Sequence, residues 1–568
     1  MSTKHSLLQG PDVQVTSGTP SQARSESVIA VNPNNPDHLI AASKKFSNPV
    51  KYVFSIGIRV SLDGGQSWAD SQLPTLPEWG SFVGMNGKDA EAGMTDPAAV
   101  FDHLGNVFYL AEPISYANDI ATIGMYVYKS TDGGLSWGQP TPLHVGDTAD
   151  DKGWIACDQN PASPHFGNVY AVWGASAPLR FARSTDHGAS WHGTGNSAPG
   201  SQLSASSFAP EISVGLDGTV HIVWYQNGTK TIEYLRSVDG GASFLAQKAV
   251  VTGIHSLDNN LPKTDGWPHF PGSTFRVLTL ATGCAFAVDA NRKHFAVAWS
   301  DFREGSARVY FRTSSNAGAS FQGPVSGQPL LGSDFVDPAL HHFHPQMVAT
   351  GSGVVGCAYL ELGPKNGGPR IDVILSASFD GAGSFSHTVT VTDQPWDPAV
   401  DAPFSHGDPN VTFIGEYFGL DADQSCFDVL WTDTRTGVQE LFFERVCAQT
   451  LVLPDIVDRG IYAQILFGVI QGGGGAVIVG GHIIKIPPRG PLFDLVHAIV
   501  AADAAGQIGG VPGRALTASV YETIGAVART AAERARLGTV AVSGIGREAP
   551  VPSFEAELRE SLEASATR

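Results

Sequence analysis

The sequence is poor in charged residues and in cysteine. Only 16% of its 568 residues are charged, and 54 acidic residues against 35 basic ones give a formal net charge of −19. Such a surplus of negative charge repels phosphate backbones and anionic lipid surfaces, so nucleic acid and an anionic membrane are not expected as the main partners. Neutral sugars, cations and proteins remain as candidate partners.

The five cysteines are too few and too scattered for a disulfide framework. Most of them lie inside apolar stretches, which is typical of buried free thiols in a reducing compartment. Cys426 and Cys447 flank one predicted hairpin and could face each other, so a bridge between these two is left open.

Long apolar runs and several well-known motifs are also missing. No run of about 18 or more apolar residues occurs, so no membrane-spanning helix is expected. The segment MSTKHSLLQGPDVQV lacks the apolar core of a signal peptide, which leaves the cytoplasm or secretion by a leaderless route as candidate locations. HExxH, GxSxG and the Walker A lysine are absent as well.

Glycine (65) and proline (36) are abundant, and the chain contains internal repeats. Six segments share the pattern Ser-x-Asp-x-Gly-x-Ser-aromatic, except that the fifth has Asn316 for the Asp and the sixth has Ala382 for the Gly. They begin 53 to 77 residues apart, which is the length of one four-stranded sheet with variable loops. The third residue of each segment accepts backbone hydrogen bonds in a turn, the glycine permits a positive φ, and the aromatic ring buries apolar area. The third residues are Asp63, Asp132, Asp186, Asp239, Asn316 and Asp380.

A pair of apolar strands precedes each of these turns, as in EISVGLDGTVHIVW, and a seventh pair, YFGLDADQSCFDVLW, is followed by no such turn. The chain therefore contains seven repeats, of which the last lacks its fourth strand. The segment from Asp12 to Thr16 reads as a strand that could supply it. Radial repetition closed in this way predicts an all-β, seven-bladed β-propeller.

The six turns resemble the Asp boxes, or bacterial neuraminidase repeats, of sialidases and related propeller proteins. The resemblance covers residues 10–447 and implies a sialidase-like β-propeller in which the Asp-box residues are structural. It does not imply one activity, because the family includes sialidases, other glycoside hydrolases, lectins and sorting receptors. Classical sialidases resemble six-bladed rings, whereas this chain has seven repeats.

The composition changes after Cys447. We predict a propeller over residues 1–449 and a small α+β module over residues 450–568, made of a hairpin at ILFGVI and AVIVGG, two amphipathic helices and a polar tail. LVLPDIVDRG reads as the linker between them. The apolar faces of the helices pack either on the hairpin or on a second subunit, so the module is also a candidate for driving homo-oligomerisation.

Acidic residues stand just before several of the innermost strands, which line the axis of a propeller. Such carboxylates could ring one mouth of the channel and bind sugar hydroxyls, hold a divalent cation such as calcium, or divide acid and base roles. They could equally cap strands by binding backbone amides. The residues are Glu26, Asp96, Asp151, Glu211 and Glu416.

The sialidase mechanism that the resemblance implies needs three arginines, a tyrosine nucleophile beside a glutamate, and an aspartate acid/base. No Arg-Ile-Pro motif precedes the first box, but Glu416 and Tyr417 form the expected pair, with Asp96 and Asp151 as candidate acids. Arg435, in WTDTR, could bind a ligand or form a salt-bridged turn with Asp433.

Two further residues are candidates for ligand binding. His344, in ALHHFHPQ, shares a strand face with His342 and could ligate a metal, although no third ligand can be named. Trp154 could offer a stacking platform to a sugar, although core packing is the ordinary role of a tryptophan.

Three functions are consistent with these features. The first is carbohydrate binding at the central mouth, and the second is a glycoside hydrolase of sialidase-like type using the mouth carboxylates and Tyr417. The third is a protein-interaction scaffold assembled through the C-terminal module.

Overall fold

The computed structural model describes residues 2–19, 22–74, 92–115, 121–146, 149–289, 291–332, 337–365 and 367–453, together with four short strands beyond them. The chain divides into two compact units, Pro11–Val446 on the one hand and Met1–Gly10 with Cys447–Arg568 on the other. The division proposed from the sequence, at residues 449 and 450, stays a prediction.

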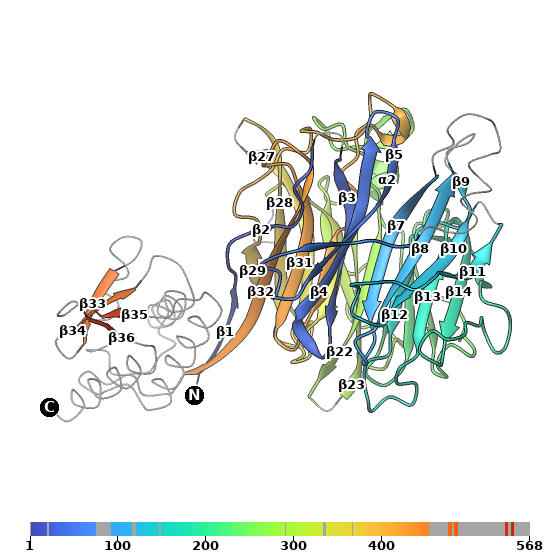
Figure 1. Ribbon diagram of the computed structural model, residues 1–568, viewed down its shortest axis with the longest axis horizontal. Helices are drawn as coiled ribbons and strands as arrows, with labels where there is room; N and C mark the ends of the chain where they lie inside the picture. Colours follow the sequence, from blue (N-terminus) through green and yellow to red (C-terminus); the bar gives the residue numbers. More distant parts are fainter. Residues whose placement is uncertain are drawn as a thin grey trace. The chain divides into compact units, whose positions relative to one another are not determined.

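The first unit is built almost entirely of antiparallel sheets (Figure 1). The first three sheets in chain order have the following strands: β3 (Arg24–Asn32), β4 (Asn35–Asn48), β5 (Val53–Ser61) and β6 (Ala69–Ser71); β7 (Ala92–Phe101), β8 (Val107–Ser115), β9 (Ala121–Thr122), β10 (Gly124–Ser130) and β11 (Thr141–Val145); β12 (Trp154–Cys157), β13 (Val169–Trp173), β14 (Ala175–Ser184) and β15 (Ser201–Phe208).

Three more sheets repeat this plan: β16 (Glu211–Val214), β17 (Val220–Gln226), β18 (Thr231–Ser237) and β19 (Lys248–Thr252); β22 (Ala281–Val288), β23 (Asn291–Asp301), β24 (Arg308–Ser314) and β25 (Gln328–Pro329); β26 (His341–Ala349), β27 (Val355–Lys365), β28 (Gly368–Ser378) and β29 (His387–Thr390). The loop between β19 and β22 adds α2 (Leu257–Asn260), β20 (Lys263–Thr264) and β21 (Trp267–Pro268), and the 3-10 helix η2 (Ser405–Gly407) follows β29.

The seventh sheet joins the two ends of the repeat region. It contains β30 (Gly419–Ala422), β31 (Cys426–Asp433) and β32 (Glu440–Leu453), and β2 (Val13–Gln14) pairs with β32 opposite Phe443 and Phe442. β2 lies within the strand predicted at Asp12–Thr16. A further strand, β1 (Ser2–Leu8), pairs with Cys447–Leu453, so Leu451–Leu453 belong to a strand and the linker predicted from residue 451 is wrong for these residues.

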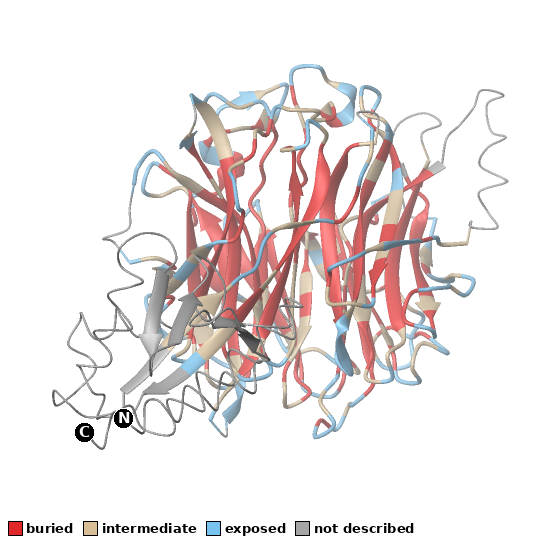
Figure 2. Cartoon of the chain, turned by 60° about the vertical axis from the view of Figure 1, so that its left-hand side comes forward, coloured by how far each residue is buried: buried red, intermediate tan, exposed pale blue. Residues whose placement is uncertain are grey.

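The sheets pack face to face because their strands are buried on both sides. On β4, Ile40 and Ala42 pack with β8 residues such as Tyr109, whereas the alternating Leu39 and Ala41 pack with Leu430 of β31. Buried residues run along most strands and exposed residues gather in the loops (Figure 2). Each fully buried aliphatic side chain contributes about 1.5–3 kcal/mol, so these interfaces are the main source of stability.

The first strands of the seven sheets, here called the hub strands, lie next to one another. They are β3, β7, β12, β16, β22, β26 and β30. Each hub strand contacts the next in this order, and β30 contacts β3.

The six repeated turns share one hydrogen-bond pattern. In the first, Asp63 Oδ1 accepts the backbone N–H of Ser67 at 2.9 Å, and Ser61 Oγ accepts that of Gly65 at 2.9 Å. Gly65 has a φ of 87°, and a side chain there would meet the ring of Phe443 on β32. The same carboxylate or amide contacts recur at Asp132, Asp186, Asp239, Asn316 and Asp380.

Cys426 and Cys447, for which the sequence left a bridge open, are each disulfide-bonded. Cys157, Cys284 and Cys357 are free and buried, as expected from their apolar surroundings.

The rest of the second unit is described only at four strands of one sheet: β33 (Gly475–Val479), β34 (His482–Ile486), β35 (Val540–Val542) and β36 (Arg547–Ala549). β33 pairs with β34, which follows it. The predicted partner ILFGVI and both predicted amphipathic helices lie outside the described residues, so the role of the module in oligomerisation stays a prediction. Among the described residues, no helix has the length and apolar character needed to span a membrane.

Candidate functional site

A repeated backbone feature brings polar side chains together at the hub strands. On or just before several of these strands one non-glycine residue has a positive φ, and the strand ladder is interrupted beside it on β3, β7 and β26. Such conformations cost about 1–3 kcal/mol each and are frequent at functional sites. The residues, here called the left-handed hub positions, are Glu26 (50°), Asp96 (44°), Lys152 (53°), Ala209 (46°) and His344 (49°).

Buried ion pairs link the charged members of this set. Lys44 forms an ion pair with Glu26, and its Nζ lies 3.4 Å from Asp96 Oδ1. Lys152 Nζ lies 2.5 Å from Glu416 Oε2. All these side chains are less than a tenth exposed, so the charges compensate one another in a medium where an unpaired charge would be costly.

Arg276 enters the cluster from the loop between β19 and β22. Its Nε lies 3.1 Å from Glu416 Oε1, and its Nη1 lies 2.8 Å from His406 Nε2. The guanidinium also lies over the rings of Trp267 and Phe413, at 4.5 and 4.4 Å. Burial disfavours the charged form of Glu416, but Arg276 and Lys152 outweigh it and lower its pKa to about 2.

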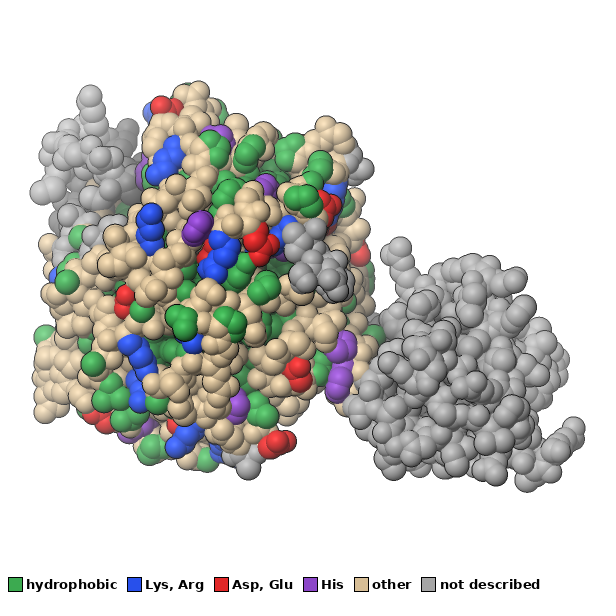
Figure 3. Space-filling model, turned by 180° about the vertical axis from the view of Figure 1, so that it is seen from behind, with side chains coloured by type: hydrophobic (Ala, Val, Ile, Leu, Met, Phe, Trp, Pro, Cys, Tyr) green, Lys and Arg blue, Asp and Glu red, His purple; other side chains and the backbone are tan. Residues whose placement is uncertain are grey.

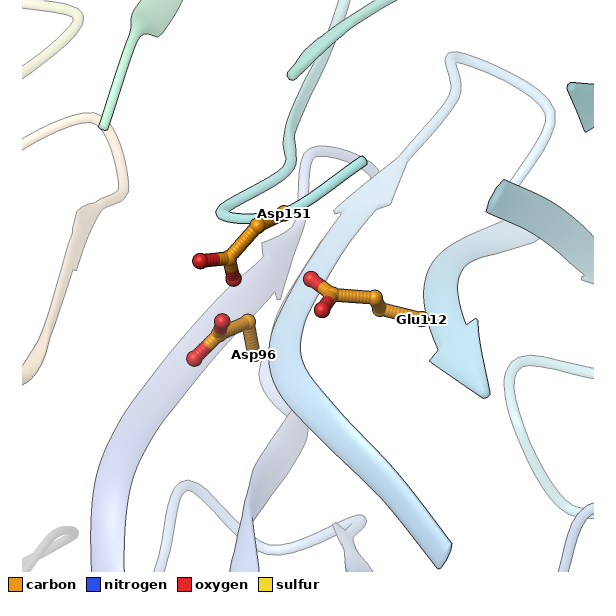
Figure 4. Close-up of side chains that lie close together, drawn as sticks. All are labelled: Asp96, Glu112 and Asp151. Carbon is orange, nitrogen blue, oxygen red and sulfur yellow. The ribbon is translucent and has the colours of Figure 1, made fainter. Parts of the chain in front are cut away.

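Three carboxyl groups meet beside these ion pairs. One carboxylate oxygen each of Asp96, Glu112 and Asp151 lies within 4.8 Å of the others, and Figure 4 shows the groups turned toward one another. Glu112 accepts the backbone N–H of Lys152 at 3.0 Å and the hydroxyl of Thr122 at 3.1 Å.

The pKa values of the two aspartates move in opposite directions. Burial, followed by the charge of Asp96, raises the pKa of Asp151 to about 7. Burial also acts on Asp96, but Lys152 and Lys44 outweigh it and hold the pKa of Asp96 well below its usual range. Asp151 is therefore a proton donor near neutral pH, and Asp96 is an acceptor.

The pKa values of Glu112 and Glu26 are also raised, so both groups hold a proton more readily than a free carboxyl group does. Burial, followed by the charge of Asp151, raises the pKa of Glu112 well above its usual range. Burial, followed by the charge of Asp96, raises the pKa of Glu26 to about 8.

Aromatic residues border the carboxyl groups. The hydroxyl of Tyr417 lies 3.5 Å from Asp96 Oδ1, and its ring lies 5.9 Å from that of Trp154. Both residues are half-buried. Burial, followed by the charge of Asp96, raises the pKa of Tyr417 well above its usual value, so the phenol stays protonated.

Asp96, Glu112 and Asp151 are the described residues whose geometry could hold a metal ion, yet the surrounding charges do not suit calcium. Lys44 and Lys152 Nζ lie 3.4 and 4.0 Å from Asp96 Oδ1, so a divalent cation bound there would stand against two ammonium groups. The ammonium groups already supply the counter-charge to these carboxylates.

Comparisons with known proteins add no family. No family model matches the chain, and no curated protein matches it. Several solved structures resemble it weakly. A protein of unknown function from Dyadobacter fermentans is 16% identical with a TM-score of 0.39, over 65% of this chain and 98% of that one. The Hadza microbial sialidase Hz136 is 13% identical with a TM-score of 0.39, over 74% and 65%. An α-L-arabinanase from Penicillium chrysogenum is 15% identical with a TM-score of 0.34, over 62% and 92%.

The structure brings most of the predicted site residues together. Asp96 and Asp151 adjoin Glu112, Glu26 pairs with Lys44, and Glu416 pairs with Lys152. Tyr417 and Trp154 lie beside this cluster.

Three predicted residues lie outside these pairs. Glu211 accepts a hydrogen bond from Gln346 at 3.3 Å. His344 occupies a left-handed hub position and has no hydrogen-bond partner among the described residues. Arg435 forms ion pairs with Asp433 and with Asp12, both at 2.6 Å, which is the salt-bridged turn named as its alternative role.

Sequence reasoning missed Lys44, Glu112, Lys152 and Arg276. Lys44 and Glu112 are paired in the ladder with Ser25 and Thr95, the residues that precede Glu26 and Asp96, so an alignment of the repeats could have found them. Arg276 lies in the long loop between β19 and β22, outside the repeated strands and turns, so no repeat pattern points to it.

Proposed function

We propose that the protein acts on glycans at the hub strands and that the site is best suited to glycoside hydrolysis. The observation that carries this proposal is the pair formed by the buried Asp96 and the half-buried Asp151, whose pKa values are driven apart. Asp151 would donate its proton to the glycosidic oxygen as the carbon–oxygen bond breaks and its electrons pass to that oxygen. Asp96 would stabilise the positive charge that develops on the sugar ring.

The close approach of the two carboxyl groups favours retention of configuration. Retaining enzymes hold their two carboxyls about 5–5.5 Å apart and inverting enzymes about 6.5–9.5 Å apart. One oxygen of Asp96 and one of Asp151 lie within 4.8 Å of each other, an upper limit that is shorter than the spacing of inverting enzymes. Asp96 would therefore attack the anomeric carbon to form a glycosyl ester, and water deprotonated by Asp151 would release the sugar and restore both groups.

We further propose that the seven sheets form one closed seven-bladed propeller. The cyclic contacts of the hub strands support closure, since β30 contacts β3. The packing of Gly65, in the first repeat, on Phe443, in the last, supports it independently.

Carbohydrate binding without cleavage is the second candidate, and the state of Tyr417 favours it over a sialidase-like reaction. A tyrosine nucleophile needs its neighbouring glutamate as a base, but Glu416 is held by Lys152 and Arg276. A protonated phenol beside the ring of Trp154 is suited to hydrogen bonding and stacking with a sugar.

Turnover of a panel of 4-nitrophenyl glycosides, covering neutral hexosides and pentosides, distinguishes the two candidates. Hydrolysis predicts release of nitrophenol from at least one substrate, with a loss of about 100-fold or more in Asp151→Asn and in Asp96→Asn. Asp421→Asn is the matched control, because burial also raises the pKa of Asp421, to about 6, but this group accepts the backbone N–H of Val31 instead. Binding to a glycan array with no turnover in the panel would support the second candidate and overturn the first.

A further inference from the structure

The left-handed hub positions differ in what they carry around the hub. On β3 and β7 and just before β12 they carry charged side chains, and these are the ones that form the ion pairs. Ahead of β16 the position is occupied by Ala209, and on β26 by His344. One part of the hub is therefore filled by paired charges, and another part has a methyl group and an imidazole.

His344 is buried without a hydrogen-bond partner. Its exposed fraction is 1%, and neither ring nitrogen has a partner among the described residues. Leaving a buried polar group unpaired costs about 1–3 kcal/mol, which adds to the cost of its positive φ. Burial lowers the pKa of His344 to about 3, so the ring is neutral and offers one donor and one acceptor.

Further polar groups follow His344 along this part of the hub. Gln346, two residues further along β26, donates to Glu211 Oε1 of β16 at 3.3 Å. Thr282 of β22 accepts the backbone N–H of Met347 at 3.1 Å. Glu211 is half-buried, so solvent reaches this part of the hub.

We propose that His344, together with the Gln346–Glu211 pair, forms a subsite that binds the hydroxyl groups of an uncharged sugar residue. This subsite rests on the proposed action on glycans and specifies its substrate class. A neutral imidazole that donates with one nitrogen and accepts with the other matches a hydroxyl, which does both.

The charges around the site favour an uncharged sugar over a carboxylated one. Binding a carboxylate strongly requires cations that are free to pair with it. Lys44, Lys152 and Arg276 are all engaged by buried carboxylates of the protein itself. A neutral sugar needs none of them to be released.

Imidazole ¹⁵N chemical shifts during sugar titrations of the whole chain test the subsite without relying on turnover. The His344 signals are assigned by their absence in the variant His344→Ala. Alanine is chosen because Ala209 occupies the equivalent left-handed hub position ahead of β16. We expect galactose, glucose or arabinose at millimolar concentration to shift them and N-acetylneuraminic acid to leave them unchanged. The His221 signals, assigned in the same way with His221→Phe, are the control. His221 is also buried, but its ring already forms a hydrogen bond with the hydroxyl of Tyr234 at 2.7 Å.

Kinetics provide the second measurement. On any neutral glycoside that is turned over, we expect His344→Ala to raise KM about tenfold or more with kcat less affected, and His344→Asn, which keeps a donor and an acceptor, to recover part of the loss. Unshifted His344 signals with all three neutral sugars, or a stronger shift with N-acetylneuraminic acid, would overturn the subsite. If Asp151→Asn loses turnover while KM and kcat of His344→Ala equal those of the wild type, the proposed reaction stands and the subsite alone is rejected. If the His344 signals shift but no glycoside is turned over, the subsite stands and the proposed reaction is rejected.

Discussion

Asp151 and Asp96 face each other with one oxygen of each carboxyl group within 4.8 Å, although Asp96 lies on β7 and Asp151 lies just before β12. A protonated acid therefore stands beside an ionised one. Because the charges of Lys44 and Lys152 both lower the pKa of Asp96, the proton remains on Asp151. The division of roles between two similar side chains thus comes from the position of two ammonium groups.

Removing Lys152 should cost far more than removing a surface cation. Lys152→Met would leave Glu416 with Arg276 alone and take a positive charge away from Asp96 and Glu26. We expect a loss of about 3–5 kcal/mol in the free energy of unfolding, measured by denaturant titration.

Arg59→Met is the matched control, because Arg59 pairs with Asp70, whose side chain is 71% exposed. Its loss should cost less than about 1 kcal/mol. Equal losses in the two variants would show that the buried ion pairs do not hold the cluster together.

The contact between Gly65 and Phe443 tests ring closure. Gly65→Ala places a methyl group about 2 Å from the ring of Phe443, at a position with a φ of 87°. Gly305→Ala imposes a similar φ, 80°, with nothing within 4 Å of the new atom. We expect Gly65→Ala to lower the free energy of unfolding by at least about 1 kcal/mol more than Gly305→Ala. Equal effects would mean that the first and last repeats do not meet.

The stability of the protein should fall with rising pH because of Glu26. The pKa of Glu26 is about 8 in the folded state and about 4.3 in an unfolded chain, so the folded state retains a proton that the unfolded chain releases. The resulting stabilisation is complete below about pH 4.3 and is lost by about pH 8. Melting temperatures in this window should decline less in Glu26→Gln than in the wild type. An equal or steeper decline in the variant would contradict the shift.

Thiol titration tests the state of the cysteines. Denatured, unreduced protein should react with 5,5′-dithiobis(2-nitrobenzoic acid) at three cysteines, Cys157, Cys284 and Cys357, and at all five after reduction. Five reactive thiols before reduction would be inconsistent with the bonded state of Cys426 and Cys447.

Much of the fold follows from local patterns in the sequence, and the site does so only in part. The six turns and their preceding strands repeat along the chain, so they could be recognised without knowing which residues meet. The sequence pointed to Glu26, Asp96 and Asp151 because each stands near the start of a hub strand or just before it. It did not point to Arg276, because this residue lies in a loop outside the repeated strands and turns. β1 was missed because its pairing with the end of β32 joins segments over 400 residues apart.

The dependence of kcat/KM on pH, measured with the best 4-nitrophenyl glycoside, tests the central claim most directly. Because Asp151 must be protonated and its pKa is about 7, activity should fall tenfold per pH unit on the alkaline side of about pH 7. Asp96 stays ionised, so no acidic limb from it is expected above about pH 4. An alkaline limb at this pH that disappears together with activity in Asp151→Asn is the predicted result. Activity that rises through pH 7, or an Asp151→Asn variant as active as the wild type, would contradict the account.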